Sequence, residues 1–162
     1  MGLQKIRKPI VSGRFYSSNP KELREQLAGF IIKGVDKIDA LGVISPHAGF
    51  SCSGVVAGEL FSSIKPRSTY VILGPNHTGL GKPFGLDPDR VWKTPLGEVQ
   101  IDTRIAQKIL KKSRYIKEDY VCHDDEHSIE VQLPFLQYLN PNFKFVPIVI
   151  ASGNREIYAG IG

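Results

Sequence analysis

Apolar residues with helical spacing mark the first predicted element, the segment SSNPKELREQLAGFIIKG at residues 17–34. Asn19 is a suitable N-cap, Pro20 fits the first helical position, and Glu22 lies three residues after the cap. Gly34 provides a left-handed stop at the other end. We therefore predict a helix that packs on the core through one apolar stripe, which consists of Leu23, Leu27, Phe30 and Ile31.

The next pattern combines two short apolar runs with a helical segment between them. Leu41–Ser45 and Thr69–Leu73 have the composition of buried strands, and SGVVAGELFSSIKP, residues 53–66, has helical spacing. A strand, a helix and a strand in this order predict a βαβ unit with parallel strands and a right-handed crossover. The predicted buried face of the helix consists of Val56, Leu60 and Ile64.

The rest of the chain predicts further alternation of strands and helices. Arg90–Thr94 and Glu98–Ile101 are expected to pair as a hairpin, and Asp102 is expected to cap the helix that follows. Later elements are a helix from about Glu126 capped by Asp124 or Asp125 with a turn or kink at Pro134, a strand at 143–150, and a helix capped by Asn154. The sequence therefore predicts one α/β domain over residues 1–162, with a mostly parallel β-sheet core and flanking helices.

Two histidines follow the predicted parallel strands at equivalent places. The runs LGVISPHAGF and YVILGPNHTG each contain a proline after the apolar residues, and a histidine follows it, His47 in the first run and His77 in the second. Ligands of open parallel sheets bind outside the carboxyl ends of the strands, so both side chains are expected to face one crevice. Imidazole is the commonest transition-metal ligand, and the pair therefore predicts a metal site; the alternative is two hydrogen-bonded structural histidines.

Composition and charge limit the partners that we expect. Of the 162 residues, 41% are hydrophobic and 23% charged, as in soluble globular proteins, and the net charge of +5 is spread along the chain rather than gathered. We therefore expect no nucleic-acid partner. No apolar run has the length of a membrane span and no signal peptide is recognisable, so no membrane partner is expected. Cys52 and Cys122 match no metal or disulfide framework, which favours a reducing, cytoplasmic location.

His127 is a third candidate for chemistry. It lies beside Glu126 and behind Asp124 and Asp125, and neighbouring carboxylates favour the imidazolium form. This predicts a general acid or proton shuttle. The alternative is a bystander histidine at a helix N-terminus whose acidic residues interact with the helix dipole.

Three further residues have weaker signals. Cys52 lies five residues after His47 and is either an additional ligand of the same site or a buried small apolar residue. Asn76 either orients a ligand or shapes the turn before His77. His123 lies in a polar stretch and is interpreted as a surface residue.

Four motifs follow one another along the chain, namely SPHAGFSCSG, ILGPNHTG, WKTPLGEVQID and DDEHSIEVQLPFL, and GRFYSSNPKELREQL precedes them. In this order they resemble the Memo family (mediator of ErbB2-driven cell motility), which is similar in fold to class III non-haem iron dioxygenases of the LigB type. The resemblance covers nearly all of the chain and implies a LigB/Memo-like fold. Family members continue beyond the position of Gly162, so the chain is expected to be a C-terminally truncated family domain, a little more than its first half.

The resemblance also implies roles for individual residues. His47 falls on the histidine of the family's Pro-His-Ala-Gly motif and His77 on that of its Gly-Pro-x-His motif, both metal-site residues, which implies iron or copper as cofactor. His127 falls on a position similar to the acid/base residue of the dioxygenases, and Asp125 on that of an acidic neighbour. The third metal ligand would come from Cys52, a carboxylate, water or a second chain.

Three functions stay open at this point. The first is a metal-binding redox protein, a non-haem metal-dependent oxidoreductase that acts on a small molecule. The second is a non-catalytic signalling module that binds a peptide in the same crevice, since animal Memo proteins are associated with phosphotyrosine peptides. The third is an inactive fragment that forms homo-oligomers through the sheet edge and apolar surface that truncation exposes.

Overall fold

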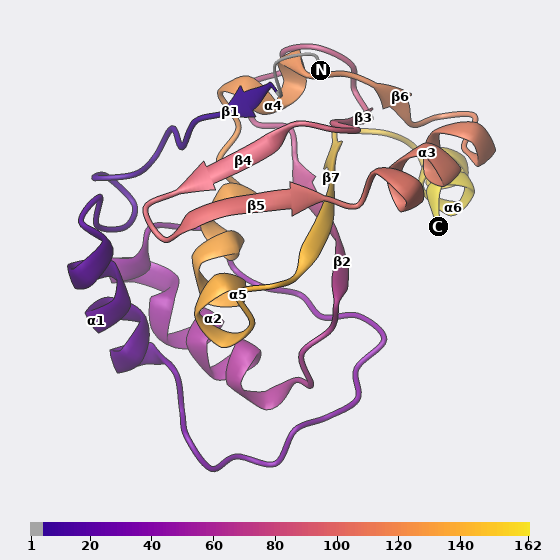
Figure 1. Ribbon diagram of the computed structural model, residues 1–162. Coiled ribbons are helices and arrows are strands. Elements are labelled where there is room, and N and C mark those ends of the chain that lie inside the picture. Colours follow the sequence, from indigo (N-terminus) through magenta and orange to yellow (C-terminus); the bar gives the residue numbers. More distant parts are fainter. Residues whose placement is uncertain (1–4) are drawn as a thin grey trace.

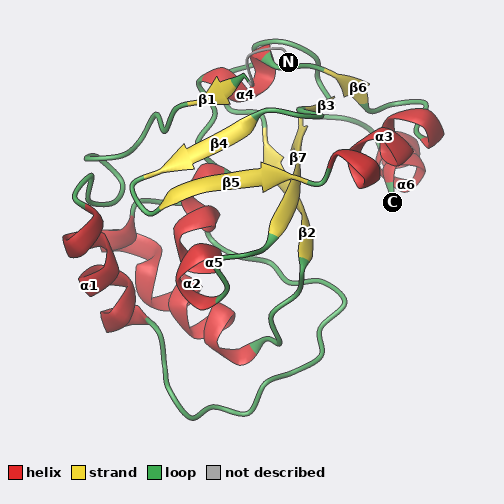
Figure 2. Cartoon of the chain, viewed as in Figure 1, coloured by secondary structure: helices red, strands yellow, loops and turns green. Residues whose placement is uncertain are grey.

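The computed structural model describes residues 5–162 and has a mixed α/β fold, in which a curled sheet of mostly parallel strands is flanked by helices (Figures 1 and 2). This confirms the predicted fold class. Helices α1 (Pro20–Phe30), α2 (Phe50–Ser63) and α5 (Leu133–Leu139) gather on one side of the central strands, while α3 (Thr103–Lys112) and α6 (Arg155–Ile161) lie on the other side (Figure 1). None of the helices in the described part of the chain has the length and apolar character needed to cross a membrane.

Strand β7 (Lys144–Ile150) is the centre of the sheet. It pairs in parallel with β2 (Thr69–Pro75) along its whole length, from Thr69 opposite Lys144 to Pro75 opposite Ile150. Its other edge pairs first with β5 (Gly97–Ile101) in parallel and then with β3 (Gly85–Leu86) in antiparallel orientation. A strand with neighbours on both edges and helices on both faces reads as a continuous apolar run, and its buried residues are Phe145, Val146, Pro147, Ile148 and Val149.

The predicted hairpin is confirmed. Strand β4 (Val91–Thr94) pairs antiparallel with β5, with Val91 opposite Gln100 and Thr94 opposite Gly97. Gly97 has a φ of 125°, a value that favours glycine in this turn. Two short strands that the sequence pattern did not predict complete the sheet, β1 (Ile6–Arg7) beside β4 and β6 (Lys117–Glu118) beside β3.

Three predicted helix caps are also confirmed. The side chain of Asn19 accepts hydrogen bonds from the backbone of Lys21 and Glu22 at the start of α1. Asp102 caps α3 and Asn154 caps α6 in the same manner, through the N–H three residues ahead. Helix α1 ends at Phe30, before the predicted stop at Gly34.

The predicted strand Leu41–Ser45 is wrong. The segment forms no ladder and runs on the far side of a groove from β2, so within residues 5–162 its backbone has no strand beside it with which to pair. Leu41 and Ile44 are 106% and 96% exposed. The predicted βαβ unit therefore lacks its first strand, and β2 has a strand on only one edge within residues 5–162.

The predicted buried face of α2 is wrong at Val56, whereas Ile64 is partly buried against the core. The helix packs through its small residues, because Phe30 of α1 occupies the space beside Gly54 and Gly58. A Cβ at Gly54 would lie 2.6 Å from Cζ of Phe30, so only glycine permits this approach. Val55 and Val56 consequently point outward, at 67% and 58% exposure.

The helix predicted from Glu126 is interrupted. A short helix α4 (Val121–Asp124) comes first, then an irregular segment, then a 3₁₀ turn η1 (Glu130–Gln132) that leads into α5. Pro134 lies in the first turn of α5, where its missing N–H costs no hydrogen bond. The irregular segment forms because Glu126 folds back on the backbone that follows it, as described below.

Candidate functional site

Three imidazoles from separate parts of the chain gather at the end of β2. His77 follows this strand, His47 precedes α2, and His127 lies between α4 and η1. The ring centroid of His77 is 5.2 Å from that of His47 and 4.7 Å from that of His127, and the remaining pair is 6.0 Å apart. The expected convergence of His47 and His77 is therefore present, although only His77 follows a strand.

The carboxylate of Glu126 holds this cluster in place. Its Oε1 atom lies 2.9 Å from Nδ1 of His77 and accepts hydrogen bonds from the backbone N–H groups of His127 and Ser128, both at 2.8 Å. Its Oε2 atom accepts the backbone N–H of His77 at 2.7 Å. A carboxylate only accepts hydrogen bonds, so Nδ1 of His77 carries a proton, and in the neutral ring Nε2 is the nitrogen with the lone pair.

Glu126 stays ionised in this environment. Burial of its side chain, which is 1% exposed, raises the pKa, but hydrogen bonds from Ser128 and His77 outweigh this and lower the pKa to about 2. Both oxygens accept hydrogen bonds from the segments that carry His77 and His127, which suits Glu126 to orienting these histidines.

His127 lies against His77 and the aromatic ring of Phe15. Its ring is within 12° of parallel to that of His77, and its centroid is 4.9 Å from that of Phe15. Burial lowers the pKa of His127; the Glu126 charge raises it, and the neighbouring histidines lower it further. Desolvation and the nearby imidazoles thus oppose the imidazolium form that a close carboxylate favours.

His47 borders a groove of about 650 Å³ between β2 and the extended segment 40–45. The groove is lined on one side by Leu41 and Val43 and on the other by residues of β2. Burial and the proximity of His77 both lower the pKa of His47, which favours the neutral ring that binds metals.

The spacing of His47 and His77 suits a shared metal ion. With a metal–nitrogen distance of about 2.1 Å, two imidazoles on one ion at angles of about 90–140° have ring centroids about 4.6–6.1 Å apart. The rings of His47 and His77 are 5.2 Å apart and inclined by 52°. His127 stacks on His77 instead, and two nearly parallel stacked rings do not have an ion in both planes.

A tighter set of potential ligand atoms, all within 4.8 Å of one another, consists of His77, Glu126 and His127. His47 lies outside this set. His47 and His77 could hold an ion without disturbing the hydrogen bonds that the Glu126 oxygens accept.

The other candidate residues lie around the cluster without joining it. The Asn76 side chain binds within its own turn, accepting from the N–H of Gly79 and donating to the carbonyl of Leu80. Asp125 is exposed at the end of α4, and Cys52 is exposed in the first turn of α2 rather than buried. Their roles in ligand binding stay predictions.

His123 differs from its interpretation as a surface residue. Its side chain is fully buried against the edge of Trp92, with ring centroids 5.4 Å apart. The sequence did not reveal that Glu126 is the residue that holds the histidine cluster in place. The motif DDEHS offers three adjacent acids, and pattern alone does not show which one turns inward.

Comparisons with known proteins identify the family of this chain. A family model described as Memo-like protein matches residues 7–162. A MEMO1 family protein of Thermotoga neapolitana is 44% identical over 163 residues, which cover 90% of this chain and 58% of that protein. MEMO1 family proteins of Archaeoglobus fulgidus and Aquifex aeolicus are each 42% identical, covering 93% and 98% of this chain and 56% and 60% of theirs. The chain thus spans less than two thirds of the length of these relatives.

Proposed function

Since the chain belongs to the Memo-like protein family, we propose that it is a metal-binding protein in which His47 and His77 hold an iron or copper ion. The observation that carries this proposal is the pairing of the two rings, 5.2 Å apart, with Glu126 on Nδ1 of His77. A carboxylate behind a histidine fixes its tautomer, orients the ring and raises its basicity as a ligand.

The chemistry proposed for the site is oxidation of a small molecule, as in non-haem dioxygenases. The bound ion would supply redox chemistry at positions that two protein ligands leave open. The residues of the chain supply the rest. Glu126 fixes His77, and His127 stacks beside it as a neutral imidazole able to accept a proton. The groove beside His47 has room for the organic substrate.

Metal titration tests this proposal. We expect anaerobic Fe²⁺ or Cu⁺ to bind at one ion per chain, measured by calorimetry and elemental analysis, and His47→Ala or His77→Ala to abolish binding. Glu98→Gln is the control, because this exposed carboxylate pairs with Lys93 on the hairpin of β4 and β5 and not with the imidazole cluster. Absence of binding at micromolar concentrations, or unchanged binding after either histidine is removed, would contradict the proposal.

A second candidate, peptide binding, is favoured by the free edge of β2. The groove beside His47 is bordered by this strand, whose second edge carries no strand within residues 5–162, and an extended peptide can add to such an edge. The test is titration of metal-free protein with a phosphotyrosine peptide, followed by hydrogen exchange. Protection of the β2 amides is expected for this candidate, and unchanged exchange would exclude it.

A further inference from the structure

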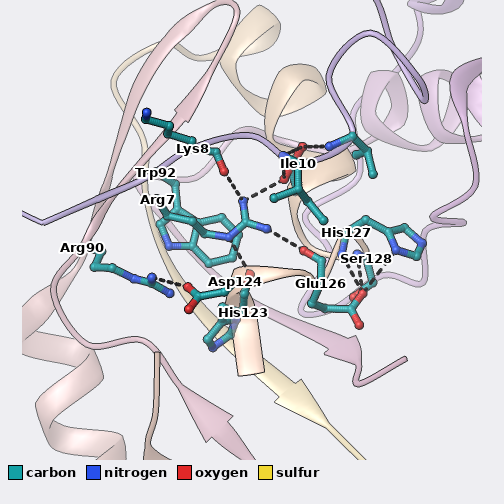
Figure 3. Close-up of polar contacts among 12 residues, drawn as sticks. Arg7, Lys8, Ile10, Arg90, Trp92, His123, Asp124, Glu126, His127 and Ser128 are labelled. Carbon is teal, nitrogen blue, oxygen red and sulfur yellow. Dashed lines mark hydrogen bonds and ion pairs between the residues drawn. The ribbon is translucent and has the colours of Figure 1, made fainter. Parts of the chain in front are cut away.

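Arg7 is a buried cation that binds the segment from His123 to Glu130 (Figure 3), and it makes one longer hydrogen bond, at 3.4 Å, to the carbonyl of Lys8. Its Nε atom donates to the backbone carbonyl of His123 at 2.7 Å, and Nη2 donates to that of Glu126 at 2.6 Å. Its Nη1 atom donates to Oε2 of Glu130 at 2.7 Å. The guanidinium also stacks on Trp92, 4.0 Å from the ring centroid. The Arg7 side chain thus binds three residues of the segment 123–130, namely His123, Glu126 and Glu130.

The carbonyl of His123 lies in the last turn of α4, and that of Glu126 lies in the irregular segment after it. The last carbonyls of a helix have no partner within it, and a buried carbonyl without a donor destabilises the fold. The rigid fork of an arginine supplies several donors at once in fixed directions, which an ammonium group does not. Arg7 therefore determines how the backbone leaves α4 and enters the segment that carries Glu126 and His127.

Glu130 fixes the other end of this arrangement. Its carboxylate accepts the backbone N–H groups of Ile10 and Val11, at 3.0–3.1 Å, and the hydroxyl of Tyr16 at 2.7 Å. Arg7 and Glu130 are 2% and 0% exposed in their side chains. The N-terminal segment and the segment from His123 to Glu130 are thereby joined by a pair that water does not reach.

We propose that Arg7 is a positioning residue for the histidine cluster, acting through Glu126. It holds the backbone carbonyl of Glu126, and the carboxylate of the same residue holds the ring and backbone of His77. Two contacts therefore connect the guanidinium to the proposed ligand. The part of this inference that concerns metal affinity rests on the proposed function, whereas the part that concerns His77 does not.

Arg7→Lys tests the inference, because lysine keeps the positive charge but lacks the planar guanidinium that donates several hydrogen bonds in fixed directions. We expect Co²⁺, used as a spectroscopic substitute for Fe²⁺, to bind about 10-fold to 100-fold more weakly. In metal-free protein, long-range ¹H–¹⁵N NMR should show His77 changing from one Nδ1–H tautomer to a mixture. Arg90→Lys is the matched control, since Arg90 is also buried and stacked but binds Asp87, Asp124 and the carbonyl of Tyr120. Arg90→Lys should leave the Co²⁺ affinity within twofold of wild type and the Nδ1–H tautomer of His77 unchanged.

The outcomes separate the two proposals. If wild-type protein binds no Co²⁺, the proposed function fails, and the His77 tautomer alone decides the role of Arg7. If Arg7→Lys leaves the tautomer unchanged, or Arg90→Lys changes both readouts equally, the inference is overturned. Should Arg7→Lys not fold, Glu130→Gln replaces it, because it weakens the anchor of Arg7. A shift of the tautomer in the same direction is then expected, and no shift would overturn the inference.

Discussion

Glu126 binds one histidine twice, at Nδ1 of the His77 ring, 2.9 Å away, and at the backbone N–H of the same residue, 2.7 Å away. The first contact fixes the tautomer and the second fixes the direction of the chain that leaves β2. Because Glu126 also accepts the N–H groups of His127 and Ser128, one buried carboxylate sets the relative position of two imidazoles.

Glu126→Gln is expected to lower the free energy of unfolding by about 2–3 kcal/mol, because an amide places N–H donors against N–H donors in a buried site. The long-range ¹H–¹⁵N spectrum of His77 should change at the same time. Urea unfolding and NMR measure the two effects. Glu98→Gln removes an exposed carboxylate paired with Lys93 and should cost less than about 1 kcal/mol. Equal losses in the two variants would contradict the role of Glu126.

The elements predicted correctly from the sequence are those with local signals. Asn19, Asp102 and Asn154 cap helices through N–H groups two or three residues away, so a short stretch of sequence contains both partners. The hairpin of β4 and β5 likewise depends on its own turn at Gly97. The motifs around His47 and His77 indicated the site because each imidazole directly follows a recognisable apolar run and a proline.

The remaining features depend on partners far along the chain. Leu41–Ser45 has a strand's composition, but a strand forms only beside another strand, and β2 lies across a groove from it. Arg7 contacts Glu130 at a separation of 123 residues. Nothing in the sequence KIRKP distinguishes this buried arginine from its basic neighbours, and the same holds for Glu126 among three consecutive acids.

Gly74→Ala is expected to lower the free energy of unfolding by about 1–3 kcal/mol and to weaken metal binding. A Cβ at this position of β2 would overlap Oγ of Ser128 and lie 2.7 Å from Cγ1 of Ile129, both just beyond His127. Thermal melting and metal titration measure these effects. Gly42→Ala is the control, because no atom lies within 4 Å of a Cβ there. Unaltered stability of Gly74→Ala would show that β2 and this segment pack less closely than described.

The two thiols should react very differently with maleimide. Cys52 is exposed, whereas Cys122 is buried, and its burial, with the charges of Asp119 and Asp87, raises its pKa to about 12. Since the thiolate is the nucleophile, native protein at pH 7 should take up one equivalent, located on Cys52 by mass spectrometry. Cys52→Ser should take up none until urea exposes the second thiol. Rapid labelling of Cys122 in native protein would contradict this environment.

His123 should make the stability of the protein depend on pH below neutrality. Neither ring nitrogen has a hydrogen-bond partner among the described residues. Burial lowers its pKa to about 4. The Asp87 charge raises the pKa, the charges of Arg7 and Arg90 lower it further, and the backbone of Gly85 raises it least. The unfolded chain, with an ordinary pKa of about 6.5, therefore binds a proton that the folded protein does not accept until about pH 4. The free energy of unfolding should fall by about 3 kcal/mol as the pH decreases across this interval.

His123→Leu isolates this contribution, because an apolar side chain leaves no buried nitrogen unpaired. At pH 7.5 the variant should unfold within about 1 kcal/mol of wild type, since the neutral imidazole makes few polar contacts that leucine would lose. At pH 4.5 it should be more stable than wild type by about 2–3 kcal/mol, because it binds no additional proton on unfolding. Urea unfolding at intervals between these pH values gives both curves. Curves that remain parallel from pH 7.5 to 4.5 would show that His123 does not titrate on unfolding, and that water reaches it in the folded protein.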